Sequence, residues 1–304
     1  MNNINRYAVR RSCLAAAAVL TLLAWASPVR AQELPVLMVH GFCSSADTWN
    51  ETLPQLSTRR YGDDAPRLYE GADGTMVART PVSSGSKTFR VDFSDLSGGF
   101  DLVAVANVPT SRKAGELKVV IDGIKQLTGA PGVIVVGHSL GGLAARAYVQ
   151  GIGLNRHGAT IAYANDLAAV IMIDTPNQGS VLASISGYDE ADACTLADTA
   201  NLRDLKPTSS FLRDLNGRAW PATAAIHSII SNNQSRDSDD VVTTTSQDLS
   251  KIPRYEFLTN SGRWLQNFKI TGILHLSVHN QATTVSIFTG IVEGVDYQYA
   301  NRPR

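Results

Sequence analysis

The chain of 304 residues balances 27 Lys and Arg against 27 Asp and Glu, and 44% of its residues are hydrophobic. No basic patch or basic stretch interleaved with aromatic residues stands out, so nothing points to nucleic acid as a partner. The length and apolar content support one large core without a second domain, and the sequence shows no internal repeat or low-complexity tract.

The first 31 residues have the pattern of an export signal. Three arginines precede the apolar run Leu14–Trp25, and Val29-Arg30-Ala31 places small residues at the expected cleavage position. A membrane anchor is the alternative, but this apolar run is too short to span a bilayer comfortably. The pair Arg10-Arg11 suggests a twin-arginine route, although the residues after it fit that route poorly. We therefore expect a signal peptide over 1–31 and a secreted or periplasmic mature domain over 32–304, whose formal charge is −4 because four arginines and no acids are removed.

Cys43 and Cys194 are the cysteines of this mature chain, because Cys13 lies in the predicted signal. In an oxidising compartment an even pair of cysteines favours a disulfide. Closing so long a loop would restrict the unfolded chain by an entropy worth roughly 4–5 kcal/mol. Two buried, unpaired thiols are the alternative, because the sequence does not show whether the two Cα atoms lie close enough.

Short runs rich in Val and Ile, bounded by Gly, Pro or polar residues, are typical of buried strands. Five such runs occur: Leu34–Val39, Val133–Val136, Ala169–Ile173, Ala224–Ile230 and Phe268–Leu274. Apolar residues at helical spacing lie from Leu117 to Leu127, and the same spacing recurs after Leu140 and after Ala282. Strands that alternate with helices predict an α/β fold, with a mostly parallel sheet covered by helices on both faces.

Residues 177–221 interrupt this alternation with several Asp and Ala residues and only short apolar clusters. They follow the predicted strand that ends near Ile173. Long insertions in α/β folds usually gather at the carboxyl ends of the strands, where ligands bind. We therefore expect a cap or lid over a site, and an ordinary surface excursion of helices and loops is the alternative.

The stretch Gly137-His138-Ser139-Leu140-Gly141 fits the pattern G-x-S-x-G between a predicted strand and a run compatible with a helix. A serine held on such a sharp turn is exposed at the tip, and a side chain at either glycine would collide with neighbouring backbone. The following helix directs its N-terminal amides towards charge that develops at the reacting centre. This pattern predicts that Ser139 is a nucleophile.

With these residues the sequence resembles the α/β-hydrolase family, in particular its secreted bacterial lipases and esterases. "VHGFCSSADTW" is similar to the family's oxyanion-loop motif, "GHSLGGLAARAY" to its nucleophile motif, and "IDTPNQGS" to the segment after the next strand. "LKPTSSFLRDLN" is similar to a segment of the cap region in many of these lipases. The resemblance reaches from about Leu34 to the last helix near Ile291, and residues 60 to 110 match less clearly.

The resemblance implies an oxyanion hole made by two backbone amides, those of Phe42 and Leu140. Donors of this kind stabilise the charge that builds on the carbonyl oxygen in the transition state, and losing one typically costs roughly 3–4 kcal/mol of barrier. A core aromatic that happens to follow a glycine turn is the alternative for Phe42. Its place in the sequence H-G-F at a strand end favours the functional interpretation.

The chain contains six histidines that could serve Ser139: His40, His138, His157, His227, His275 and His279. His138 lies on the incoming side of the tight turn, where its ring is poorly placed to reach the serine oxygen. His40 belongs to the oxyanion loop, which we expect it to hold by a hydrogen bond. His157 lies in a polar run and is expected in solvent, and His227 lies in an apolar strand, where a hydrogen-bonded core histidine is the default.

The two remaining histidines follow the last predicted strand. The base of this fold belongs on the loop that leaves that strand, ahead of the final helix. His275 occupies that loop with the family's spacing, whereas His279 could begin or flank the helix. The sequence therefore favours His275 as the general base.

A carboxylate must hold the other imidazole nitrogen, and the family places it after the strand that precedes the histidine's strand. The segment "RDSDDVVTTTS" offers Asp237, Asp239 and Asp240 there. In the lipases that it resembles, the acid is followed by one variable residue and two apolar ones, which selects Asp239 and leaves Asp240 as the alternative. A solvated turn or a calcium-coordinating loop is the alternative for the other acids. Asp240 replaces the family's common glycine, and its charge could raise the pKa of the histidine.

These residues together predict an exported carboxylic-ester hydrolase, a lipase or esterase that acts on acylglycerols or aliphatic esters through an acyl-enzyme, with a lipid–water interface as a possible setting. A polyester depolymerase, an acyltransferase or a peptidase could use the same site, and a non-catalytic binder of lipid or protein is the rival from another class. No metal-binding spacing or nucleotide motif occurs. We expect no cofactor, although calcium stays possible, and the oligomeric state is left open.

Overall fold

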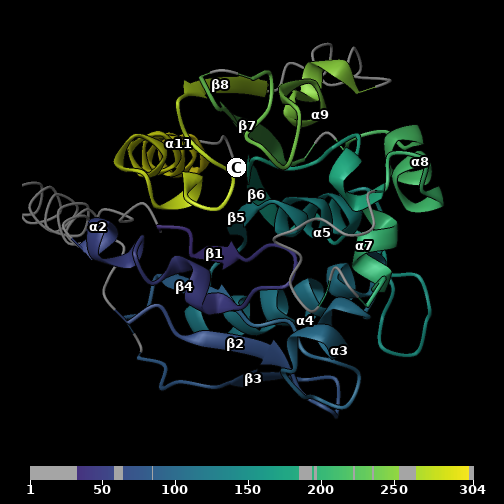
Figure 1. The fold of residues 1–304 in the computed structure, drawn as a ribbon. Helices are drawn as coiled ribbons and strands as arrows, with labels where there is room; N and C mark the ends of the chain where they lie inside the picture. Colours follow the sequence, from purple (N-terminus) through teal and green to yellow (C-terminus); the bar gives the residue numbers. More distant parts are fainter. Residues whose placement is uncertain are drawn as a thin grey trace, which may run out of the picture. The chain divides into compact units, whose positions relative to one another are not determined.

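The computed structural model describes residues 33–57, 64–83, 85–184, 194, 197–221, 223–234, 236–252 and 265–300 (Figure 1). The predicted signal peptide lies outside these residues. None of the helices in the described part of the chain has the length and hydrophobicity needed to cross a bilayer.

A sheet of eight strands forms the centre of the fold, in the order β3-β2-β4-β1-β5-β6-β7-β8. All neighbouring strands are parallel except β2 and β3, which run antiparallel. The mostly parallel sheet predicted from the sequence is therefore confirmed. Its strands are β1 (Val36–Val39), β2 (Arg67–Glu70), β3 (Met76–Ala78), β4 (Thr88–Val91), β5 (Val133–His138), β6 (Leu167–Ile173), β7 (Ala225–Asn232) and β8 (Leu265–Thr271).

Helices cover both faces of the sheet, because the central strands are apolar on both sides. On β5, Val133 and Val135 pack into one core with α4 and α5, whereas Ile134 and Val136 pack into the other with α2 and α11. Figure 1 shows α4 and α5 on one side of the sheet and α11 on the other. The described helices are η1 (Ala46–Trp49), α2 (Leu53–Ser57), α3 (Leu102–Ala106), α4 (Thr110–Thr128), α5 (Leu140–Val149), η2 (Val181–Ser184), α7 (Ala200–Asp204), α8 (Ser210–Gly217), α9 (Thr244–Gln247), η3 (Leu249–Lys251), η4 (Val278–Asn280) and α11 (Ala282–Ala300).

The sequence reasoning predicted β1, β5, β6, β7 and β8, with β8 placed about three residues too late, and missed β2, β3 and β4. Two of the missed strands, β2 and β4, carry charged residues that break the apolar pattern, and β3 has only three residues. Arg67 on β2 bonds the buried Asp92 at 2.7 Å, and Arg79 bonds the same carboxylate at 2.8 Å. The charge of Arg67 on β2 is therefore compensated by an ion pair with a distant segment of the chain, which cannot be recognised from the sequence of the strand itself.

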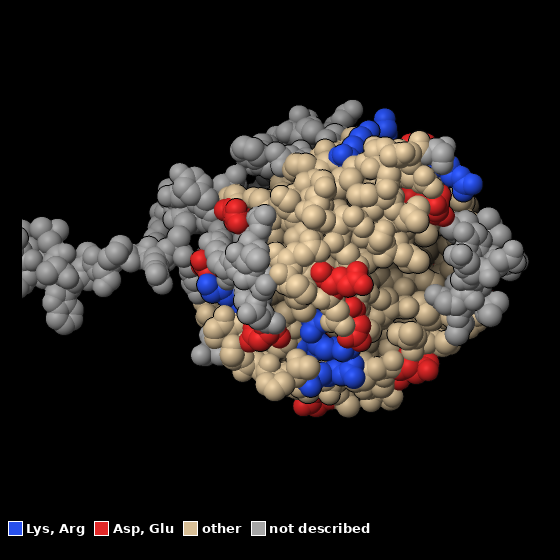
Figure 2. All heavy atoms as spheres, turned by 60° about the vertical axis from the view of Figure 1, so that its left-hand side comes forward, with Lys and Arg blue, Asp and Glu red and all other residues tan. Residues whose placement is uncertain are grey.

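The surface carries both signs of charge. Figure 2 shows one face of the molecule, on which Lys and Arg side chains lie beside Asp and Glu side chains.

The insertion between β6 and β7 packs on the α4 and α5 side of the sheet. Leu205, Leu212 and Leu215 belong to the same core as α4 and α5. The buried Arg146 of α5 donates to Asn216 of the insertion at 3.0 Å. Residues 185–193, 195 and 196 of the predicted cap lie outside the described residues, and its role as a lid stays a prediction.

A disulfide joins Cys43 to Cys194, with the Cα atoms 5.9 Å apart. Of the two alternatives left by the sequence, the structure has the bonded pair. Cys43 directly follows the H-G-F turn, and Cys194 belongs to the insertion. The bond therefore ties the loop after β1 to the segment between β6 and β7.

Replacing both cysteines with serine is expected to destabilise the protein. The disulfide joins residues 151 positions apart, so its loss frees a long loop in the unfolded chain, and removal of such a bond typically costs about 2–5 kcal/mol. Denaturant unfolding of the oxidised chain and of Cys43→Ser/Cys194→Ser measures the difference. A reductant should lower the free energy of unfolding of the parent chain and leave that of the serine variant unchanged. Equal free energies of unfolding of the two proteins without reductant would contradict the expectation.

Candidate active site

Ser139 lies on a sharp turn between β5 and α5, with its backbone in a strained region at φ 52° and ψ −121°. Its N–H donates to the carbonyl of Ile173 on β6 at 2.8 Å, which fixes the turn against the neighbouring strand. A Cβ on Gly137 would lie 2.6 Å from the backbone nitrogen of Gly142. The glycine is therefore required by close backbone packing, as the sequence pattern predicts.

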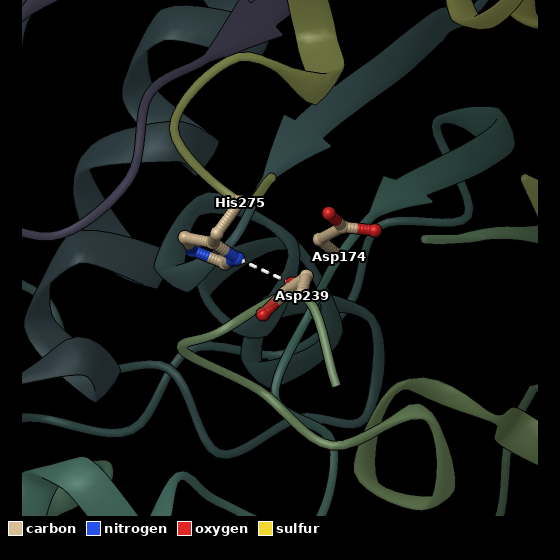
Figure 3. A group of neighbouring side chains, drawn as sticks. All are labelled: Asp174, Asp239 and His275. Atoms are coloured by element: carbon tan, nitrogen blue, oxygen red, sulfur yellow. Dashed lines mark hydrogen bonds and ion pairs between the residues drawn. The ribbon is translucent and has the colours of Figure 1, made fainter. Parts of the chain in front are cut away.

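His275 reaches Ser139 from the loop after β8. The Ser139 hydroxyl donates to His275 Nε2 at 2.9 Å, and His275 Nδ1–H donates to Asp239 Oδ2 at 2.7 Å. All three side chains are buried. Figure 3 shows Asp239 facing the imidazole of His275, joined by this hydrogen bond. The structure thus brings together the three residues that the sequence selected, across 136 positions of chain.

The turn after β7 orients Asp239 towards the imidazole. The backbone N–H groups of Val241 and Val242 donate to Asp239 Oδ1 at 2.9 and 2.6 Å, and Gln247 Nε2 donates to Oδ2 at 3.0 Å. The backbone N–H of His275 donates to the Asp239 carbonyl at 3.1 Å. These donors and the imidazole together fix the position of the Asp239 carboxylate.

The alternative acid, Asp240, does not face the imidazole. Its Oδ2 accepts from Asn233 at 3.1 Å, and Arg236 lies 3.5 Å from its Oδ1. Asp237 accepts a hydrogen bond from Thr244. Of the three adjacent acids, Asp239 is the one that contacts His275.

The H-G-F loop after β1 packs against the nucleophile turn. A Cβ on Gly41 would lie 3.1 Å from the Ser139 Cβ, and one on Gly141 would lie 2.6 Å from the carbonyl oxygen of His40. Within the described residues, neither the Phe42 N–H nor the Leu140 N–H donates a hydrogen bond. The N–H of Leu140, next to Ser139 in the chain, and that of Phe42, in the loop packed against Ser139, are thus free for a ligand.

The comparisons with known proteins agree with this architecture. Residues 36–268 match the profile of the alpha/beta hydrolase family. The chain belongs to the alpha/beta hydrolase family. The matched range contains Ser139 and Asp239 and ends before His275. A search of curated proteins found no match.

Solved structures share the alpha/beta hydrolase fold at low identity. The mature form of Bacillus licheniformis lipase BlEst2 has a TM-score of 0.55 at 15% identity, covering 88% of this chain and 93% of that chain. The product of the gene lin2722 from Listeria innocua has a TM-score of 0.54 at 14% identity, covering 90% and 95%. At these identities the likeness establishes the fold.

His138, next to Ser139 in the chain, supports the loop of His275 in this alpha/beta hydrolase. Its Nε2–H donates to the His275 carbonyl at 3.0 Å, and its ring centroid lies 4.6 Å from that of His279. Burial, with the neighbouring His279 and His275, holds the pKa of His138 well below its usual value, so the ring is neutral. His279 Nε2–H donates to the Thr48 carbonyl at 2.9 Å. Both rings are therefore structural supports for the histidine loop.

The other histidines lie away from the Ser139 hydroxyl. His40 Nδ1–H donates to the Gly41 carbonyl at 3.0 Å and its Nε2 accepts from the Phe93 N–H at 3.3 Å, as expected for a residue that holds the oxyanion loop. His157 is exposed. His227 is buried on β7, but within the described residues neither of its ring nitrogens has a hydrogen-bond partner, so the expectation of a hydrogen-bonded core histidine was wrong.

One buried carboxyl beside the site was missed by the sequence reasoning. Asp174 follows β6, and its carboxyl lies with Asp239 and His275 in a group whose nearest polar atoms are all within 4.8 Å (Figure 3). Burial alone would lower the pKa of His275, but the hydrogen bond and charge of Asp239, with the charge that Asp174 carries when it is ionised, raise it above its ordinary value. The additional acid near the base is therefore Asp174 and not Asp240. An aspartate directly after a buried strand next to the nucleophile's strand was the available signal.

Proposed function

We propose that this alpha/beta hydrolase is an exported serine carboxylic-ester hydrolase in which Ser139 is the nucleophile, His275 the general base and Asp239 the acid. The observation that carries the proposal is the unbroken pair of hydrogen bonds at 2.9 and 2.7 Å from the serine hydroxyl through the imidazole to the carboxylate. A serine is a weak nucleophile unless an adjacent base removes its proton, and this arrangement supplies that base.

The proposed reaction has two steps. Ser139 Oγ attacks the ester carbonyl carbon while its proton moves to His275 Nε2, and the negative charge on the carbonyl oxygen is stabilised by the N–H groups of Phe42 and Leu140. Collapse of this intermediate breaks the bond to the alcohol oxygen, which takes the proton from His275 and leaves an acyl-serine. Water then gives a proton to His275 as it attacks the acyl carbon. Collapse of this second intermediate breaks the bond between the acyl carbon and Ser139 Oγ, which takes the proton from His275, and the acid is released. Asp239 stabilises the imidazolium in both steps, and no step uses a cofactor.

We further propose an acylglycerol or aliphatic ester as the substrate. Leu274 and Leu276 flank His275 and are 48% and 77% exposed, and Val181 in the insertion is also exposed. Apolar side chains kept at the surface beside a reacting centre favour a substrate with an apolar acyl chain or a lipid surface. The Bacillus structure with this fold is described as a lipase, which agrees with this choice.

The disulfide supports the proposed export. Disulfides form and persist in secreted and periplasmic compartments and are rare in a reducing cytosol. Together with the export pattern of residues 1–31, the bond favours a secreted or periplasmic setting.

A fluorophosphonate probe tests the proposed function, because only an activated serine reacts quickly with it. The parent chain should label at Ser139, with the site identified by peptide mass spectrometry, and Ser139→Ala should not label. The base must be neutral to accept the proton, and the pKa of His275 is raised above its ordinary value, so the labelling rate should fall as the pH is lowered through that raised pKa.

Absence of labelling would favour a non-catalytic binder over the enzyme. The other reactions of the same site would be separated by product analysis after labelling succeeds. An acyltransferase gives a new ester when an alcohol is supplied, a polyester depolymerase releases soluble fragments from a film, and a peptidase cleaves an amide as well as its matching ester, whereas an esterase shows a large ester preference. A chelator should leave ester turnover unchanged if calcium has no part.

A further inference from the structure

Asp174 has no part in the proposed steps, yet it lies directly beside the residues that carry them. It follows β6 with a backbone φ of 47°, and its side chain is completely buried. Its Oδ1 accepts from the Ser231 N–H at 2.9 Å, and its Oδ2 accepts from the Ser231 hydroxyl. Figure 3 shows it next to Asp239 and His275, although the three come from the ends of three different strands. Burial of a carboxyl group is unfavourable, so its place beside the candidate acid and base suggests a role in the site.

Two carboxyl groups this close do not both ionise readily, because each negative charge opposes the other in a buried site. The donors decide which group holds the charge. Asp239 accepts hydrogen bonds from two backbone N–H groups, Gln247 and His275, whereas both donors to Asp174 come from Ser231. Asp174, which has fewer donors, is therefore the member of the pair that keeps a proton more readily. Burial and the charge of Asp239 raise the pKa of Asp174 to about 8.

We propose that Asp174 is a positioning residue for His275, forming a carboxyl pair with Asp239 in which loss of the Asp174 proton to solvent makes the imidazole a stronger base. This inference rests on the proposed function. The second negative charge stabilises the imidazolium that forms when Ser139 loses its proton, so it acts on the transition state more than on the resting enzyme.

The surroundings of Asp174 make this effect specific. The ionisable groups that act on it are Asp239, from the turn after β7, and His275, from the loop after β8. Ser231 on β7 and Gln247 on α9 are neutral, and His138 at the end of β5 is kept neutral by burial. Ionisation of Asp174 is therefore felt chiefly by the acid and base of the site.

The same geometry makes Asp174 a substitute for Asp239. Removal of the Asp239 side chain removes the like charge that holds the proton on Asp174. Asp174 would then ionise at a lower pH than in the parent chain, and it would be the remaining carboxyl group of the cluster with His275. Alanine is the informative replacement at 239, because asparagine would present an N–H group to the imidazole.

The pH dependence of ester turnover tests whether ionisation of Asp174 strengthens His275 as a base. The parent chain should show a second rise in kcat, roughly 3- to 10-fold, centred near pH 8, as Asp174 ionises. Asp174→Asn, whose amide keeps both bonds to Ser231 with the hydroxyl reversed, should lack this rise. Asp240→Asn is the matched control, since it removes a nearby acid that faces Asn233, and it should keep the rise. Persistence of the rise in Asp174→Asn would overturn the proposal.

A comparison of double and single variants tests whether Asp174 can substitute for Asp239. The Asp174→Asn change should lower kcat at least about tenfold more in the Asp239→Ala chain than in the parent chain, because there Asp174 is the remaining carboxylate. If Asp174→Asn lowered kcat by the same factor in the Asp239→Ala chain and in the parent chain, the proposal would be overturned. If Ser139→Ala is inactive while these two results fail, the carboxyl pair is refuted and the proposed function stands. Full turnover by Ser139→Ala would refute the proposed function itself.

Ser231→Ala keeps the test usable if Asp174→Asn fails to fold. This variant leaves the carboxyl in place and removes the hydroxyl that donates to it. Because the charged form of Asp174 then loses a donor, the alkaline rise should move to higher pH. An unmoved rise would contradict the assignment to Asp174.

Discussion

Replacing Ser139 with alanine is expected to lower kcat for a short-chain 4-nitrophenyl ester by roughly 10⁴-fold or more, with the fold unchanged. The hydroxyl is the atom that attacks, and no other described group occupies its place between His275 Nε2 and the free N–H groups of the turn. His275→Ala should cost a similar factor, because the serine then keeps its proton. The two losses should not add in the double variant, since each one alone stops the same step.

Ser277→Ala is the matched control for this series. It removes a hydroxyl from the same loop as His275, and that hydroxyl is exposed and donates to the carbonyl of Leu274. Its kcat should stay within about twofold of the parent, as for most surface changes. The Ser139→Ala preparation must be free of traces of parent enzyme. A purified Ser139→Ala chain with more than a few per cent of the parent rate would refute the assignment of Ser139 as the nucleophile.

Asp239→Asn is expected to lower kcat by roughly 10⁴-fold, because the amide would present the wrong hydrogen-bonding group to the histidine. The N–H groups of Val241 and Val242 hold Oδ1, so the amide nitrogen is directed at His275 Nδ1. An N–H group there forces the proton onto Nε2, where it faces the serine. The imidazole can then no longer accept the hydroxyl proton.

The neighbouring Asp240→Asn separates the two candidate acids. Its carboxylate faces Asn233 and Arg236, both away from the imidazole, so kcat should change by less than about threefold. Steady-state kinetics of both variants at one pH gives the comparison. A large loss in Asp240→Asn with little change in Asp239→Asn would reverse the assignment.

The sequence located the residues of the site because each was marked by a local pattern. A Cβ on Gly137 would lie 2.6 Å from backbone of the turn itself, and one on Gly141 would lie 2.6 Å from backbone of the loop after β1, so both positions appear as glycine in G-x-S-x-G. Asp239 was distinguished from Asp240 by spacing to two apolar residues, and the structure shows why this spacing matters. The backbone N–H groups of those same residues, 241 and 242, fold back onto its carboxylate.

Features that depend on distant neighbours were not predictable in the same way. The charged strands β2 and β4 need partners such as Arg67 and Asp92, which lie 25 positions apart. Asp174 has no unusual local pattern, and its importance arises only where the ends of β6, β7 and β8 meet. The expectation that Asp240 supplies extra charge near the base was wrong for the same reason, since adjacency in the chain does not give adjacency of side chains.

The disulfide between Cys43 and Cys194 encloses a loop of the polypeptide that contains Ser139 but neither Asp239 nor His275. A protease that cuts once inside this loop, for example in the insertion before Cys194, leaves both fragments linked. A cut after Cys194, in the rest of the insertion, instead separates the nucleophile from its acid and base, and only noncovalent packing then keeps them together. The consequences of backbone cleavage in an environment rich in proteases therefore depend on which side of Cys194 is cut.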